Sequence, residues 1–215
     1  MDELYCYKVS EFTHWPYRLS ARTPAFHAGK RSSTLRRVTG MEFKECNEDD
    51  VKLSKLESGF IEENVFTEIH KNTTIVCHDI LIRYHSENAS GILLLKRNGE
   101  PAHNVYYPAG GRLLRGVPIE ESMRRKIKEE TGLSASNFTF LTVGRTLFSS
   151  DPFSHKKGTD TVNLVYIADG IGTLMPNSSV SHPIFITKDT YGAMRKNLSA
   201  YNQYILDIVD TRNLW

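Results

Sequence analysis

Residues 110–133 read GGRLLRGVPIEESMRRKIKEETGL, and this stretch decides the expected fold. The double glycine predicts a turn, because glycine adopts backbone conformations that other residues avoid. A helix follows, since Pro118 suits a first helical position and Gly132 suits a stop. Apolar residues at helical spacing predict the buried stripe of this helix: Ile119, Met123, Ile127 and, less cleanly, Leu133.

Two adjacent carboxylates near the end of this helix predict a cation site. Glu129 and Glu130 are about 100° apart on a helix, and a double glycine lets the backbone approach a ligand closely. Mg²⁺ prefers oxygen ligands and usually binds through one or two carboxylates plus substrate phosphates. We therefore predict that Gly110, Gly111, Glu129 and Glu130 hold a metal ion against a phosphate.

The same charges have a simpler interpretation as a solvated surface helix. Arg125 with Glu129, and Lys126 with Glu130, are i,i+4 pairs, each worth about 0.2–0.5 kcal/mol. The double glycine and the strand expected before it favour metal and pyrophosphate binding over this alternative.

The rest of the chain predicts strands around one central helix. Alternating apolar and β-branched residues predict strands at 73–83, 91–97, 105–107, 137–148, 158–167 and 182–187. Helical spacing predicts helices at 60–71 and 188–215, besides the one at 118–132. This order favours an α/β (α+β) fold, with a mixed sheet between helices.

Composition indicates a folded domain with an N-terminal extension. The 215 residues suit one domain over 59–215 and an extension over 1–58, which is basic before residue 41 and acidic over 42–50. Aromatic residues between positions 5 and 26 are expected to pack on the main domain or across a homodimer. Contact of this basic stretch with nucleic acid is a weaker alternative, because the net charge is only +2.

Two further features bear on where the protein works. No apolar run approaches the length of a membrane span, so no membrane partner is expected. Cys6, Cys46 and Cys77 are odd in number and form no CxxC pair. They are typical of reduced thiols, which predicts a cytoplasmic protein.

Residues 60 to about 205 resemble the Nudix hydrolases, and within them most closely the GDP-mannose mannosyl hydrolase group. The resemblance rests on 110–133 together with the segments 72–82, 94–102, 107–112 and 158–160. It implies a Nudix-type mixed sheet between helices and a nucleotide as the small-molecule substrate.

The chain departs from the general Nudix pattern at two positions. Val117 and Lys126 stand where that pattern has glutamates. The mannosyl hydrolase group also lacks the second of these carboxylates. The resemblance therefore implies one Mg²⁺, with Mn²⁺ as the alternative, held by a glycine carbonyl and by Glu130.

The resemblance also implies a reaction and several residue roles. In the mannosyl hydrolase group a base activates water on the far face of the sugar, and the C–O bond at the anomeric carbon breaks. His182 is the candidate base and His155 its rival. Arg97 matches the arginine of that group that would neutralise the departing diphosphate; the alternative is a surface arginine at a strand end. The other candidate substrate-binding residues are Arg112 and Asp160, and Asp151 could add a further carboxylate.

Three functions follow from these expectations. The first is Mg²⁺-dependent hydrolysis of a nucleoside diphosphate sugar such as GDP-mannose. The second is ordinary pyrophosphate cleavage of a nucleoside diphosphate linked to another group. The third is a catalytically degenerate module that binds such a ligand, which the residues at 117 and 126 favour.

Overall fold

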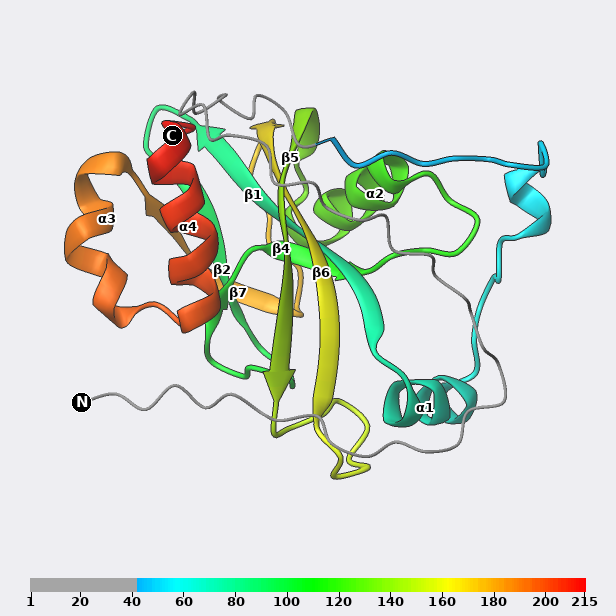
Figure 1. Cartoon of the computed structure of the whole chain (residues 1–215). Coiled ribbons are helices and arrows are strands. Elements are labelled where there is room, and N and C mark those ends of the chain that lie inside the picture. Colours follow the sequence, from blue (N-terminus) through cyan, green and yellow to red (C-terminus); the bar gives the residue numbers. More distant parts are fainter. Residues whose placement is uncertain (1–41) are drawn as a thin grey trace, which may run out of the picture. The chain divides into compact units, whose positions relative to one another are not determined.

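The computed structural model describes residues 42–215 (Figure 1). The expectations for Cys6 and for the aromatic residues between 5 and 26 lie outside the described residues. Within the described part, the helices are α1 (Glu63–Asn72), α2 (Ile119–Thr131), α3 (Lys188–Met194) and α4 (Ala200–Arg212), with short 3-10 turns at Leu53–Lys55 and Arg195–Asn197. No helix in this part is long and apolar enough to cross a membrane.

A mixed sheet forms the centre of the domain. Strand β1 pairs in parallel with β6 on one side, and in antiparallel fashion with β2 and β4 on the other. Strands β3 and β7 pair with β2, and β5 pairs with β6. The strands are β1 (Ile75–His85), β2 (Ser90–Arg97), β3 (Tyr106–Tyr107), β4 (Ala109–Arg112), β5 (Ser134–Phe148), β6 (Thr159–Ile171) and β7 (Val180–Ile186).

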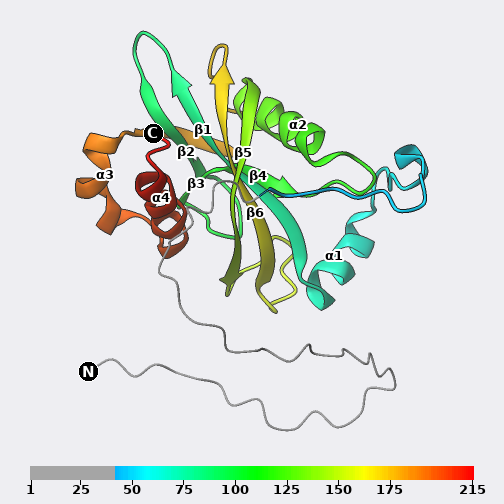
Figure 2. The ribbon, with the colours of Figure 1, turned by 45° about the horizontal axis from the view of Figure 1, so that its top comes forward.

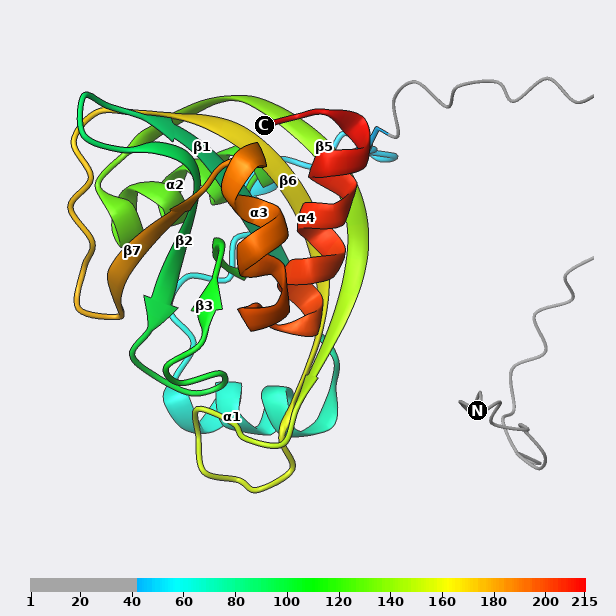
Figure 3. The same ribbon diagram turned by 90° about the vertical axis from the view of Figure 1, so that its left-hand side faces the viewer.

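Helices cover both faces of this sheet. Figures 1 and 3 show α2 on one face and the pair α3 and α4 on the other. Successive residues of β1 point to opposite faces, so Ile80 and Ile82 pack in the cluster with α2. Leu81 packs in the second cluster, with α3 and α4. The expected mixed sheet between helices is confirmed.

Helix α2 begins and ends as its sequence predicts. Pro118 is the residue before the first helical turn, and Gly132 closes the helix with a φ of +72°, a conformation that glycine adopts at low cost. All four residues of the predicted stripe are buried. The backbone N–H of Ile119 donates to the Glu45 carboxylate at 3.2 Å, so a residue of the acidic stretch caps this helix.

Two local expectations are wrong. Gly110 and Gly111 lie in strand β4, opposite Asp79 and His78 of β1, and do not form a turn. The segment 188–215 is not one helix: it breaks after Asn197, because Ser199 is extended and its hydroxyl accepts the N–H of Asn202 to start α4. A side-chain cap competes with continuation of the first helix at this point.

Candidate functional site

A cavity of about 310 Å³ opens between one end of the sheet and helix α1. Figure 2 shows α1 beside one end of β1 and beside the loop that joins β5 to β6. Its wall includes polar and aromatic residues from several elements: Asp79 of β1, Arg97 of β2, Gly110, Gly111 and Arg112 of β4, and Phe66 and His70 of α1. A smaller hollow shares Arg97 and Gly110 with this cavity and also reaches Glu130.

Glu130 turns into the protein and is held at both oxygens. Its Oε2 accepts the backbone N–H of Gly110 at 3.2 Å, and its Oε1 lies 3.2 Å from the Lys126 ammonium. Its side chain is 11% exposed. Burial raises the pKa of Glu130, while Lys126 and the Gly110 N–H oppose that shift. Glu130 is thus a fixed carboxylate beside the double glycine.

Glu129 points the other way. Its side chain is 64% exposed, and its carboxylate lies 3.7 Å from Lys126. The expected pair of Arg125 with Glu129 is not formed, because Arg125 binds Glu121 on the preceding turn. The structure therefore brings Gly110, Gly111 and Glu130 together, and it leaves Glu129 on the surface.

Asp79 is a second carboxylate at this place, and the sequence prediction missed it. It pairs in register with Gly110, and a Cβ atom on that glycine would lie 2.4 Å from Asp79 Oδ1. The Tyr201 hydroxyl donates to Asp79 Oδ2 at 2.6 Å. Burial raises the pKa of Asp79 to about 6; Tyr201 and Arg97 oppose the shift, and Glu130 adds to it. An acidic residue inside an apolar strand was the available signal.

Two arginines face the same cavity. The Nε of Arg97 is buried without a hydrogen-bond partner among the described residues. The guanidinium of Arg112 lies over the ring of Phe66, 4.3 Å from its centroid, which holds it in place. A guanidinium donates readily to phosphate oxygens, and a buried donor without a partner is costly. An anion bound in this cavity would accept hydrogen bonds from the two guanidinium groups and give the buried Nε of Arg97 a partner.

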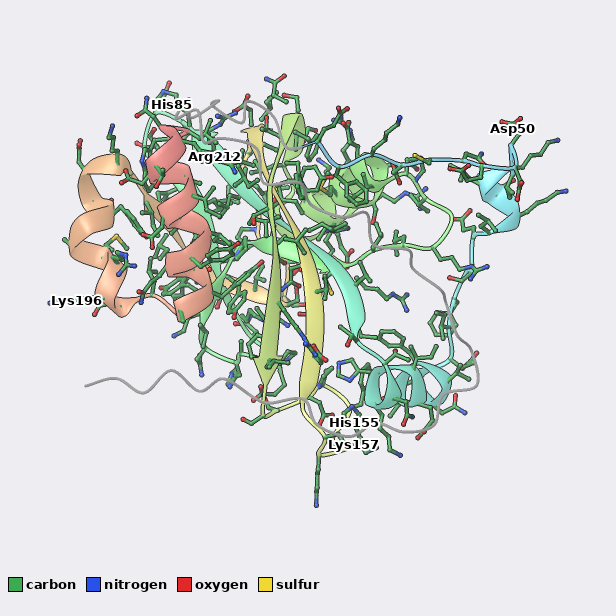
Figure 4. All side chains as sticks on the ribbon, viewed as in Figure 1. Asp50, His85, His155, Lys157, Lys196 and Arg212 are labelled. Atoms are coloured by element: carbon green, nitrogen blue, oxygen red, sulfur yellow. The ribbon has the colours of Figure 1, made fainter. Side chains whose placement is uncertain are left out.

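The histidine that reaches the cavity is His70, which the sequence analysis did not single out. His155 lies in the loop between β5 and β6 (Figure 4), and its Nε2 is 2.8 Å from Nδ1 of His70. The N–H of Lys157 donates to Nδ1 of His155 at 3.1 Å. The Nδ1 of His155 also lies 3.4 Å from the Asp151 carboxylate, so either histidine can be the donor in the hydrogen bond that joins the two rings, depending on the tautomer.

Asp151 organises this loop. Its carboxylate is buried and accepts the backbone N–H groups of Phe153, His155 and Lys156. Burial lowers the pKa of His70; neighbouring His155 adds to this shift and Asp151 opposes it. His155 contacts His70 but does not line the cavity.

Two predicted site residues lie elsewhere. Asp160 binds Arg145 through two hydrogen bonds of 2.9 and 2.7 Å and accepts the Thr74 hydroxyl at 2.9 Å, outside the cavity that holds Arg97. His182 is exposed within strand β7, with a φ of +41°, and lines neither of the two hollows described above. His182 lies inside β7, where a strand was expected at 182–187.

The sequence of this chain matches a known protein family. A family model described as the NUDIX domain matches residues 79–190, which is more than half of the 215-residue chain. The chain belongs to the NUDIX domain family. The match begins at Asp79 and includes β4 and the whole of α2. The matched segment thus includes strand β4 with its double glycine and helix α2, which carries Glu130.

Individual relatives of this NUDIX chain were also found. An ADP-ribose pyrophosphatase of Methanocaldococcus jannaschii is 36% identical over 89 residues, 40% of this chain and 47% of that protein. The match thus spans about half the length of that relative.

A solved structure at low sequence identity has a similar fold. The MutT protein of Methanosarcina mazei Go1 aligns with a TM-score of 0.50 at 19% identity, over 65% of this chain and 95% of that one. The NUDIX domain of Shewanella oneidensis NrtR, solved with ADP ribose, aligns with a TM-score of 0.47 at 15% identity, over 71% and 98%. The similarity to the MutT protein supports the fold alone.

The donors of this NUDIX site fit a divalent cation that takes some of its ligands from a bound substrate. Within residues 42–215, no group of three or more histidine, cysteine or acidic side chains is arranged to hold a metal ion. Glu130 supplies a carboxylate beside the Gly110–Gly111 backbone. Because Mg²⁺ binds through one or two carboxylates plus substrate phosphates, these residues fit a single ion that is shared with a bound diphosphate.

Proposed function

We propose that this NUDIX domain hydrolyses a nucleoside diphosphate sugar, with GDP-mannose as the representative substrate. The observation that carries the proposal is the meeting of Arg97 and Arg112 in one cavity with Gly110 and Gly111, next to Glu130. Two guanidinium groups match the charge and geometry of a diphosphate. Phe66 and His70 supply a partly apolar wall for the remainder of the ligand.

Mg²⁺, or Mn²⁺ in its place, would be held by Glu130 and the backbone of Gly110 and Gly111, together with the diphosphate. When bound, the ion supplies positive charge that stabilises the leaving phosphate oxygens. Arg97 and Arg112 bind and orient the same oxygens. Glu129 has no part in this arrangement, since its side chain faces solvent.

The bond we propose to break is the C–O bond at the anomeric carbon. Cleavage at phosphorus by several metals needs several carboxylates, and Lys126 stands where one of them is expected. A diphosphate bound by two arginines is a good leaving group, which favours substitution at the sugar carbon. Water forms a new bond to that carbon and gives one proton to the base, and the diphosphate departs with the electron pair of the broken C–O bond.

His70 takes the place of His155 and His182 as the proposed histidine of the reaction. It lines the cavity, and its ring is fixed by the hydrogen bond to His155 and by edge contacts with Phe66 and Phe153. A histidine held this way can orient water or a sugar hydroxyl and exchange a proton with it. His155 and Asp151 position this ring.

Pyrophosphate cleavage is the second candidate. It is favoured by the 36% identity to a protein named ADP-ribose pyrophosphatase. Binding without turnover is the third candidate and is favoured by the cation at position 126.

The proposal is tested by turnover with a panel of substrates. The purified protein is mixed with Mg²⁺ or Mn²⁺ and with GDP-mannose, other nucleotide sugars and ADP-ribose, and the products are separated by chromatography. Release of a nucleoside diphosphate and a free sugar is the expected result. A nucleoside monophosphate with a sugar phosphate would support the second candidate, and ligand binding without any product would support the third.

A further inference from the structure

We propose that Lys126 is a built-in cation of the site, which neutralises Glu130 in the free protein so that a divalent ion binds only together with a diphosphate. This inference rests on the proposed function and concerns the same site. Three observations carry it: the position of the ammonium, the occupation of both Glu130 oxygens, and the charge balance around them.

The Lys126 ammonium is held in place from two directions. Helix α2 brings its Nζ to 3.2 Å from Glu130 and 3.7 Å from Glu129. Strand β4 confines its stem, because a Cβ atom on Gly111 would lie only 3.0 Å from Lys126 Cε. The side chain is 27% exposed. The lysine thus lies along the double glycine and is not a freely solvated surface group.

Both oxygens of Glu130 already have a positive or donating neighbour. Lys126 is at Oε1, and the N–H of Gly110 is at Oε2. A divalent ion that coordinates Glu130 therefore comes close to the Lys126 ammonium, whose positive charge repels it. If the ammonium moves away, the lysine keeps only the exposed carboxylate of Glu129.

The charges close to Glu130 are balanced without a metal ion. Asp79 and Glu130 are the two carboxylates, and Glu130 is near enough to raise the pKa of Asp79. Lys126 and Arg97 are the cations that face Glu130. A divalent ion alone would give this place an excess of positive charge, whereas a bound diphosphate adds the negative charge that offsets it.

The test measures Mn²⁺ binding directly, by the electron paramagnetic resonance signal of free Mn²⁺. Wild type is compared with Lys126→Glu and Lys126→Gln, without nucleotide and with α,β-methylene-ADP, a diphosphate that cannot be cleaved at its P–C–P bridge. Lys128→Glu is the control, because it makes the same charge change on an exposed position of the same helix.

Without nucleotide, Lys126→Glu should bind Mn²⁺ at least ~10-fold more tightly than wild type and Lys128→Glu. The methylene analogue should tighten Mn²⁺ binding to wild type by ~10-fold or more, and should have a smaller effect on Lys126→Glu. If thermal melting shows that Lys126→Glu does not fold, Lys126→Gln takes its place, and it too should bind Mn²⁺ more tightly than wild type.

Equal Mn²⁺ affinity in wild type and the folded Lys126 variants, without nucleotide, would overturn the proposal. Tight Mn²⁺ binding to wild type that the analogue does not alter would overturn it too. The nucleotide-free titration does not depend on turnover. A protein that hydrolyses nothing but gains a Mn²⁺ site on loss of Lys126 would therefore refute the proposed function and keep this inference.

Discussion

The ammonium of Lys126 lies 3.2 Å from Oε1 of Glu130, on the inner side of the last turns of α2. Its other acidic neighbour, Glu129, is exposed. The adjacent glutamates are therefore not equivalent: one is buried beside the double glycine and the other is solvated. Glu130 is therefore the proposed metal ligand, whereas Glu129 forms only an exposed ion pair.

Glu130→Gln should lower kcat/KM at least ~100-fold, because removal of the carboxylate charge removes several kcal/mol of metal-dependent stabilisation. The fold should persist, since glutamine keeps an oxygen that can accept the Gly110 N–H. Glu129→Gln is the matched comparison and should change kcat/KM less than ~3-fold, as expected for an exposed ion pair. Near-normal turnover in folded Glu130→Gln protein would contradict the role of this carboxylate.

Arg97→Met should weaken binding of a nucleoside diphosphate at least ~10-fold, because charged hydrogen bonds typically contribute about 1.5–3 kcal/mol. Isothermal titration with α,β-methylene-ADP measures the change. Arg145→Met is the control, since Arg145 is bound to Asp160 outside the cavity. If both variants bind the nucleotide like wild type, Arg97 does not contact the diphosphate.

His70→Asn should lower kcat by roughly 10- to 100-fold, a value at or below the usual contribution of a positioned acid or base. Asparagine can either donate to His155 or accept from it, so thermal melting should show a folded protein. His182→Gln should leave kcat unchanged, because His182 is exposed on β7. Loss of activity in His182→Gln alone would show that His182, the base expected from sequence, takes part in the reaction and that His70 does not.

Asp79 should make the free energy of unfolding decrease as the pH rises through the acidic range. Burial raises the pKa of Asp79 to about 6, from 3.8 for an unperturbed group. Between these values the folded protein keeps the proton and the unfolded chain releases it, so the contribution of this group to stability falls as pH rises from about 4 to about 6.

Asp79→Asn removes that dependence. Its free energy of unfolding should therefore rise, relative to wild type, by on the order of 2 kcal/mol between pH 4 and pH 7. Urea denaturation at several pH values provides the measurement. A difference between the two proteins that does not vary with pH would show that Asp79 titrates like a solvated carboxylate.

Local patterns in the sequence predicted α2 well. The spacing of Ile119, Met123 and Ile127 and the stop at Gly132 depend on neighbours within a few turns, and the structure confirms them. Burial of Glu130 follows the same periodicity. The contrast with Glu129 could not be read from sequence, because it depends on where β4 and the lysine stem pack.

The missed features all depend on contacts between distant segments. Gly110 and Gly111 became strand because β4 pairs with β1, more than thirty residues earlier in the chain. Asp79 joins the site through that pairing, and His70 joins it through a loop 85 residues away. No local period encodes such contacts. The Ser199 cap, by contrast, was a local signal that the helical pattern of 188–215 obscured.

The most direct test of the proposed reaction is hydrolysis in ¹⁸O-labelled water, with GDP-mannose or whichever nucleotide sugar in the panel is turned over, followed by mass spectrometry of both products. Attack on the anomeric carbon predicts the label in the free sugar and none in the nucleoside diphosphate. Label in a nucleoside monophosphate or a sugar phosphate would contradict C–O cleavage and show attack on phosphorus instead.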